Sequence, residues 1–215
     1  MDNIRNDMKH TYTFAGLQIA PANLIFDGKN FAIAKNWKVN SLGEAYGKKK
    51  GSTYFNWNMC HNIYVNGWRM PTIYEWENII GTEREGSVYN GQENACYAYI
   101  QVNVLFKCHG LLLFPDGATI NGVEIGDIND YEIITEITEQ QLSKLLTQGC
   151  AFLPAFNSFN IGDDLSDCKN KGVYMSDTEY DPYESEVLVF SEGFLIAYGM
   201  VADKSKYMPV RLVRE

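Results

Sequence analysis

The chain has 215 residues, a formal net charge of −9 and 46% hydrophobic residues. A nucleic-acid partner is disfavoured by this charge, because phosphate contacts require a basic surface. No membrane span is expected either, because the longest apolar run near the middle, residues 111–114, is far below the ~20 residues that a spanning helix needs.

The domain organisation is expected to be simple. Residues 1–13 are expected to form a flexible arm, and residues 14–215 a single domain, because β-rich domains commonly reach this length. The first ten residues are polar and contain no apolar segment of a secretory signal. The five cysteines are odd in number and form no CxxC pair, which favours free, buried thiols over a disulfide framework, with one disulfide or one reactive thiol as the alternatives. They are Cys60, Cys96, Cys108, Cys150 and Cys168.

The first third of the chain predicts short strands. Residues 14–26 read as two strands broken at Pro21, and the turn at residues 27–30 leads into a strand at residues 31–34. Lys48, Lys49 and Lys50 stand between two glycines and are expected in a solvated loop. Residues 54–58 are rich in aromatic side chains.

A helix is predicted to begin after Thr72. Thr72 and Glu75 have the spacing of a capping box, and Pro71 keeps the preceding residue extended. The apolar positions recur at helical spacing and give the helix one buried face. They are Ile73, Trp76, Ile79 and Ile80. The segment holds no group arranged for chemistry, and Trp68 and Trp76 are expected to anchor the core.

The rest of the chain predicts more strands and a second helix. Residues 81–94 are expected to form a polar loop, with strands at 97–104 and 111–114. Thr138 and Gln141 predict a capping box for a helix that ends at Gly149 and buries Leu142, Leu145 and Leu146. Residues 151–155 are expected to return to the core. A hairpin of residues 186–190 and 194–198 and a strand at 209–213 complete an α+β domain with many short antiparallel strands.

Several phrases of the sequence occur together and in order. They are G-W-R-M-P-T-x-x-E-W at residues 67–76, A-P-A-N-L at 20–24, G-L-L-L-F-P-D-G at 110–117, F-L-P-A at 152–155, Y-M-S-D-T-E-Y at 174–180 and V-R-L-V at 210–213. Together they resemble the FISUMP (major paralogous domain) and DUF1566-like family of Bacteroidetes-type bacteria. The resemblance implies the C-type-lectin-like fold of the formylglycine-generating-enzyme branch, with two main helices.

The departures from the family pattern bear on chemistry. Met175 stands where the family has Trp, and Asp177 where it has Ser, in what is expected to be a packed turn. Formylglycine generation uses a cysteine pair near the C-terminal core, and no cysteine follows Cys168. The iron-dependent relatives use clustered histidines, whereas His10 and the other two, His61 and His109, are widely separated in the sequence.

Several further groups have side chains of the kinds used in catalysis or metal binding. Cys60 and His61 are adjacent, and in a strand their side chains would point to opposite faces. The carboxylate pairs Asp163-Asp164 and Asp127/Asp130 are not selected for acid–base work by anything around them. Asp163, Asp164 and Asp167 offer oxygen ligands for a calcium ion, although no sugar-binding E-P-N motif is present. No catalytic residue, cofactor or metal ion is therefore expected.

The candidate site lies in the last third of the chain. Between Gly172 and Ala202 there are six acidic residues and no Lys or Arg, with aromatic residues interleaved. Aromatic side chains with polar tips beside carboxylates suit recognition of a glycan or a protein, although several must pack in the core. The candidate ligand-binding residues are Asp177, Glu179, Tyr180, Tyr183, Phe194 and Tyr198.

The sequence favours a non-enzymatic binding or adhesion module of a bacterial surface or secreted assembly. The resemblance implies that this module is located outside the cell or at the cell surface. Two alternatives remain open: a phage virion or receptor-binding component of the same fold, and a degenerate formylglycine-generating-type enzyme with a metal near Cys168, His61 or His109.

Overall fold

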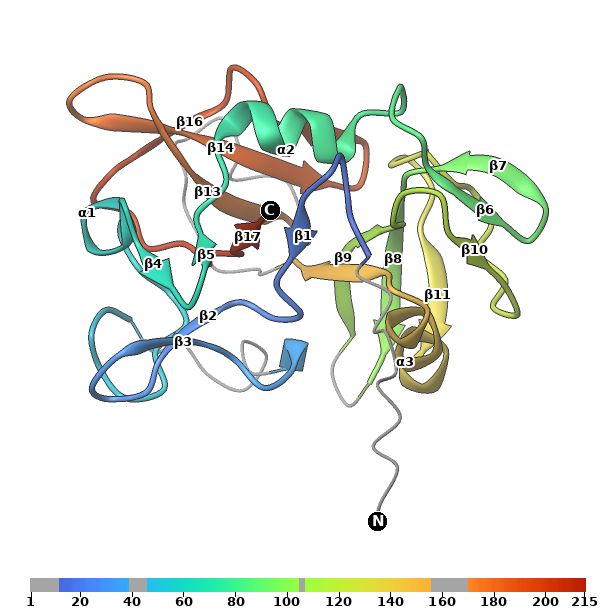
Figure 1. Cartoon of the computed structure of the whole chain (residues 1–215), viewed down its shortest axis with the longest axis horizontal. Coiled ribbons are helices and arrows are strands. Elements are labelled where there is room, and N and C mark those ends of the chain that lie inside the picture. The colour runs from blue at the N-terminus through green and yellow to red at the C-terminus, as the bar shows by residue number, and fades with distance from the viewer. Residues whose placement is uncertain (1–11, 39–45, 105–106, 156–169) are drawn as a thin grey trace, which may run out of the picture.

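The computed structural model describes residues 12–38, 46–104, 107–155 and 170–215. Within them the chain forms an α+β fold with three helices and mostly antiparallel strands. Figure 1 shows two groups of strands side by side, with helix α2 lying across the top between them. No helix in these ranges is long and apolar enough to cross a membrane.

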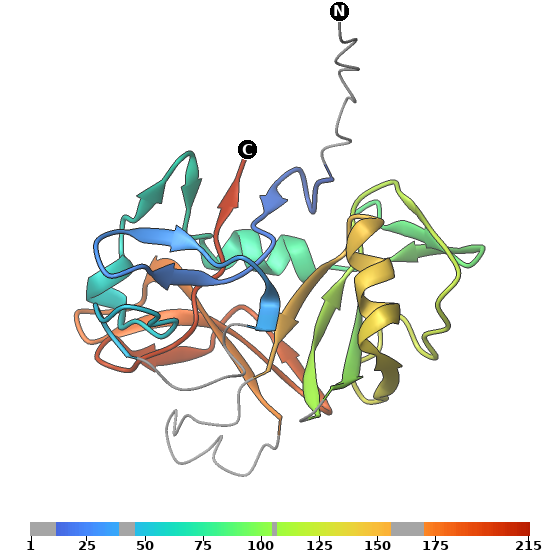
Figure 2. The same cartoon turned by 90° about the horizontal axis from the view of Figure 1, so that it is seen from below.

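One four-stranded sheet lies within the right-hand part of the molecule in Figure 1. Its order is β11 (Thr135–Thr138), β8 (Tyr97–Asn103), β9 (Cys108–Leu113) and β12 (Ala151–Pro154), and only the β11–β8 pair is parallel. Both faces are buried, because Tyr97 and Tyr99 enter one core cluster while Ala98 and Ile100 enter another. Helix α3 (Glu139–Thr147) covers the outer face, as Figure 2 shows.

A second sheet contains the predicted hairpin. Strand β14 (Glu184–Ser191) lies at its centre, paired with β13 (Gly172–Glu179), β15 (Phe194–Ile196) and β16 (Val201–Asp203). Ser191 pairs with Phe194, so the β14–β15 loop is Glu192-Gly193, with Gly193 at φ +79°. The hairpin is confirmed. Met175 and Asp177 lie in strand β13, and the expectation of a packed turn there was wrong.

Three smaller sheets and a one-turn helix complete the fold. They are β1 (Gln18–Ile19), β17 (Val213–Arg214), β5 (Trp68–Arg69) and β4 (Tyr64–Val65) in one sheet, β10 (Thr119–Ile120), β6 (Ser87–Tyr89) and β7 (Gln92–Ala95) in another, β2 (Leu24–Phe26) with β3 (Phe31–Ile33), and helix α1 (Trp57–Cys60). The two strands predicted within residues 14–26 correspond to β1 and β2, and the turn at residues 27–30 leads into the predicted third strand, β3, so these predictions are confirmed.

Two segments differ from expectation. The predicted loop at residues 81–94 contains β6 and most of β7. Asn90 and Gly91 adopt positive φ and form a tight turn between the two strands. The first three residues of β7 are polar and exposed. The terminal strand is β17, which begins at Val213, whereas the predicted strand began at Pro209. Pro209 has no N–H for a regular ladder, and the backbone around it bonds to several separate segments instead.

Both predicted helices begin at the predicted caps. Helix α2 (Ile73–Ile80) starts after Thr72, whose hydroxyl accepts from the Glu75 N–H while the Glu75 carboxylate accepts from the Thr72 N–H. Glu75 also receives two hydrogen bonds from Arg69, at 2.7 and 2.8 Å. Burial opposes the charge of Glu75, but Arg69 and the cap still hold its pKa below the ordinary value. The same box caps α3, where Thr138 and Gln141 exchange hydrogen bonds.

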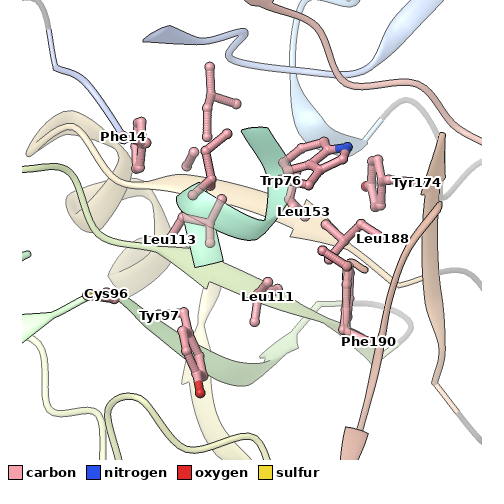
Figure 3. Packing of buried hydrophobic residues seen from close by; sticks show 14 of the residues in the cluster. Phe14, Trp76, Cys96, Tyr97, Leu111, Leu113, Leu153, Tyr174, Leu188 and Phe190 are labelled. Atoms are coloured by element: carbon pink, nitrogen blue, oxygen red, sulfur yellow. The ribbon is translucent and has the colours of Figure 1, made fainter. Parts of the chain in front are cut away.

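Helix α2 packs into a core shared by both large sheets. Trp76 is fully buried between them, close to Tyr174, and its indole N–H donates to the Met175 carbonyl. Figure 3 shows Trp76 beside Tyr174, with Leu153, Leu188 and Phe190 below it. Trp76 is thus a core anchor as expected. Trp68 is only partly buried, and the Arg214 guanidinium lies 4.4 Å from its ring centre.

A buried arginine ties the C-terminal segment to two distant parts of the chain. Arg211 is fully buried and donates to the Asn23 side chain, the Ala20 carbonyl and the Phe152 carbonyl at 2.7–2.8 Å. All three acceptors are neutral, and burial lowers the pKa of this guanidinium. These bonds give the V-R-L-V phrase a structural role.

Candidate functional site

The tip of the β13–β14 hairpin presents two of the predicted residues to solvent. Tyr180 is 63% exposed and Tyr183 is 77% exposed. Asp181 fixes the turn between them, because its carboxylate accepts from the Tyr183 and Glu184 N–H groups at 2.7 Å each. Both phenol rings are therefore displayed on an ordered turn.

Tyr198 is exposed as well, and it is held by a partner that sequence reasoning missed. Its ring stacks on Tyr74 of helix α2, with ring centres 6.0 Å apart and planes inclined by 30°. Each of the two side chains is 58% exposed. Tyr74 lies opposite the apolar face of α2, and a large aromatic residue on the outer side of an amphipathic helix was the available signal.

The stacked pair and the hairpin tip lie at the same end of the second sheet. The hydroxyl of Thr178, two residues before Tyr180, accepts from the N–H of Ile73, the neighbour of Tyr74. In Figure 1 the β13–β14 turn and the first turn of α2 occupy the same upper left part of the molecule. We call the four side chains of Tyr74, Tyr180, Tyr183 and Tyr198 the tyrosine face.

The two predicted carboxylates, Asp177 and Glu179, already bind other side chains of the protein. Asp177 accepts from the His61 ring and from the Asn62 N–H, both at 3.2 Å. Glu179 pairs with Lys204, whose ammonium is almost buried and lies 4.7 Å from the centre of the Trp57 ring. Both carboxylates therefore hold α1 and β16 against the hairpin, so a ligand would meet them already paired.

Phe194 is placed apart from the tyrosine face. It begins β15 at the opposite end of β14 from the hairpin tip and is partly buried. Its side chain packs against the core cluster on the far side of the sheet from α2, whereas Leu195 and Ala197 contact the cluster on the α2 side. The position of Phe194 therefore indicates core packing.

The paired Cys60 and His61 do not form a nucleophilic site. Cys60 ends helix α1 and His61 caps it, so the strand assumed for them was wrong. The Cys60 thiol is fully buried, donates to the Asn56 carbonyl, and has a pKa raised by burial to about 12. The His61 ring stacks on the Trp57 ring, with ring centres 4.0 Å apart. The thiolate required for attack is therefore disfavoured.

The remaining thiols and histidines in the described ranges show no constellation for catalysis. Burial raises the pKa of the Cys108 and Cys150 thiols to about 12, and it also raises the pKa of the Cys96 thiol. His109 pairs with Gln101 at 2.7 Å, and burial lowers its pKa. No group of three or more His, Cys, Asp or Glu residues that could hold a metal ion occurs among the residues that the structure describes.

Several expected groups lie outside the described residues. These are His10, Cys168 and the proposed calcium ligands Asp163, Asp164 and Asp167. Asp127 and Asp130 lie within the described ranges, and neither belongs to a group of residues that could hold a metal ion.

Comparison of the chain with protein-family models, curated proteins and solved structures finds no match.

Proposed function

We propose that this chain is a non-enzymatic binding module that contacts a glycan or a protein through the tyrosine face. The observation that carries the proposal is the exposure of four tyrosine rings, between 58% and 77%, two of them at the β13–β14 turn and two stacked on one another where α2 meets the segment after β15. Exposed apolar patches on a protein surface often mark interaction sites. A tyrosine offers a large apolar ring and a hydroxyl, and it loses little conformational entropy when it is immobilised.

The order of the tyrosine face supports this proposal. Asp181 fixes the turn that carries Tyr180 and Tyr183, and Tyr74 and Tyr198 restrain one another by stacking. A surface that is already ordered costs less entropy on binding than a mobile one. The Lys204–Glu179 pair beneath the tip adds to this rigidity.

The proposal includes a fold class and a location. We propose that the α+β arrangement is C-type-lectin-like and that the chain is related to the FISUMP and DUF1566-like family. The structural roles of the shared phrases support this: Arg69 binds Glu75 in the first, and Arg211 joins three segments in the last. The corresponding location is a bacterial surface or a secreted assembly.

A glycan array and a pull-down from bacterial or host surface extracts would test the binding role. We expect a specific ligand for the wild-type chain and a loss of binding for the triple variant Tyr180→Ala/Tyr183→Ala/Tyr198→Ala. Ile133→Ala is a matched control, because Ile133 is 49% exposed and lies outside the tyrosine face. Circular dichroism would show that both variants keep the fold. Undiminished binding by the folded triple variant would contradict the site.

A further inference from the structure

An open groove lies between the β2–β3 turn and the β4–β5 hairpin, on elements that do not belong to the tyrosine face. These two hairpins are neighbours in both cartoons (Figures 1 and 2). The groove has a volume of about 400 Å³. It is lined by Asn30, Phe31, Ile63, Tyr64, Val65 and Asn66. Tyr64 is 73% exposed, so the groove has an aromatic ring that is open to solvent.

Positive charge is concentrated beside this groove. Lys29 directly precedes the lining residue Asn30, and the Lys48 ammonium lies 5.8 Å from the centre of the Phe31 ring. The stem of Lys50 lies against Gly28, where an added Cβ would be 3.3 Å from the Lys50 Cβ, so the two loops abut. The patch consists of Lys29, Lys48, Lys49 and Lys50, all of them exposed.

Little negative charge balances this patch. None of its lysines forms a salt bridge within the described part of the chain. Asp27 is the only acidic residue in the described ranges 27–38 and 46–60. Its carboxylate already accepts from the N–H groups of Lys29 and Asn30, at 2.8 Å each. In a chain of net charge −9, this groove therefore favours an anion.

Two amide side chains complete the groove. Asn30 and Asn66 form no side-chain hydrogen bond to the described residues, and each offers two donors and one acceptor. Asn66 is fixed by a two-residue turn in which it has φ +51° and Gly67 has φ +87°, between the paired residues Val65 and Trp68. Free polar groups on fixed turns suit the recognition of a hydroxylated ligand.

From these features we propose that the groove binds an anionic saccharide. The Tyr64 ring would pack against the apolar face of a sugar ring, and the amides of Asn30 and Asn66 would bind its hydroxyl groups. The Lys48 and Lys50 ammonium groups would pair with a carboxylate or a sulfate. This site is independent of the proposed tyrosine face.

Titration calorimetry of the full chain at low salt tests this proposal with oligosaccharides of equal length. The probes are a sulfated heparin fragment, a carboxylated oligogalacturonate and a neutral malto-oligosaccharide. We expect binding of at least one of the two charged probes, and binding of the neutral probe at least about tenfold weaker, because a neutral saccharide forms no charge pairs with the lysines. The two charged probes distinguish a sulfate from a carboxylate ligand.

Variants separate this site from a general charge effect. Lys48→Gln/Lys50→Gln should weaken binding about tenfold, whereas Lys107→Gln/Lys206→Gln, with the same change in net charge, should leave it unchanged. Tyr64→Ala should also weaken binding, and its high exposure means that the fold should be retained. The triple tyrosine-face variant should bind the charged probe as the wild-type chain does.

Three results would overturn the proposal. The first is no binding of either charged saccharide. The second is equal weakening by the two lysine pairs, which would indicate net charge alone. The third is equally tight binding of polyglutamate that does not depend on Tyr64, which would indicate an acidic peptide or a non-specific anion.

Discussion

Replacing Glu75 with alanine removes two sets of contacts at the start of helix α2. The carboxylate closes the capping box by accepting from the Thr72 N–H at 2.8 Å, and it accepts two hydrogen bonds from Arg69. Loss of a cap costs about 1 kcal/mol. The ion pair is bidentate but partly exposed, with side-chain exposures of 33% for Arg69 and 22% for Glu75, so we assign it about 1 kcal/mol. The expected total is about 2 kcal/mol.

For a chain of this length, a loss of about 2 kcal/mol lowers the melting temperature by about 4–8 °C. Thermal unfolding at pH 7, followed by circular dichroism, would measure the shift. Glu75→Gln is the matched control, because glutamine can still accept from the Thr72 N–H but carries no charge for Arg69. It should lose about half as much as Glu75→Ala.

The contribution of Glu75 should also depend on pH. Because the folded protein lowers the pKa of Glu75, its contribution is present above the ordinary value of 4.5 and is lost as the pH falls through the lowered folded value. The difference between wild type and Glu75→Ala should therefore be largest near pH 7 and shrink below pH 4.5. An unchanged melting temperature at pH 7, or a difference that grows in acid, would refute this reasoning.

Three further predictions concern the core. Arg211→Met should destabilise the fold by about 3–5 kcal/mol, measured by urea unfolding, because three buried acceptors lose their donor; a stable variant would show that the cost of burying the charge exceeds the value of its bonds. Gly172→Ala should cost about 1–3 kcal/mol in the same assay, because the new Cβ would stand 2.0 Å from the buried Phe190 ring; full stability would contradict this packing. The Cys60 and Cys150 thiols should resist alkylation at pH 8 until urea unfolds the chain, because their pKa values are raised to about 12; rapid alkylation of the folded protein, followed by mass spectrometry, would contradict their burial.

Local signals in the sequence predicted helices α2 and α3 but not the one-turn helix α1. Thr72 with Glu75 and Thr138 with Gln141 each form a complete capping box within one turn, so neither depends on distant residues. The β6–β7 hairpin was missed although Asn90-Gly91 is a strong turn signal, because the polar residues of β7 hide the alternation of a strand.

The candidate site was harder to predict, because its arrangement depends on contacts between distant segments. Exposure of Tyr180 and Tyr183 follows from a turn signal at Asp181, which is local. The stacking of Tyr74 on Tyr198 requires knowledge of where α2 packs on the sheet. The pairing of Glu179, at the end of β13, with Lys204, in the turn after β16, likewise joins residues that are distant in sequence.

The most direct test of the proposed function is to measure the affinity of the tyrosine face for its ligand. With a ligand found on the array or in the pull-down, biolayer interferometry would compare wild type with Tyr180→Ala/Tyr183→Ala/Tyr198→Ala. Aromatic residues central to an interface cost about 1 kcal/mol or more each when truncated, so we predict that Kd rises by about a hundredfold. An unchanged Kd for the folded triple variant would contradict a binding role for this face.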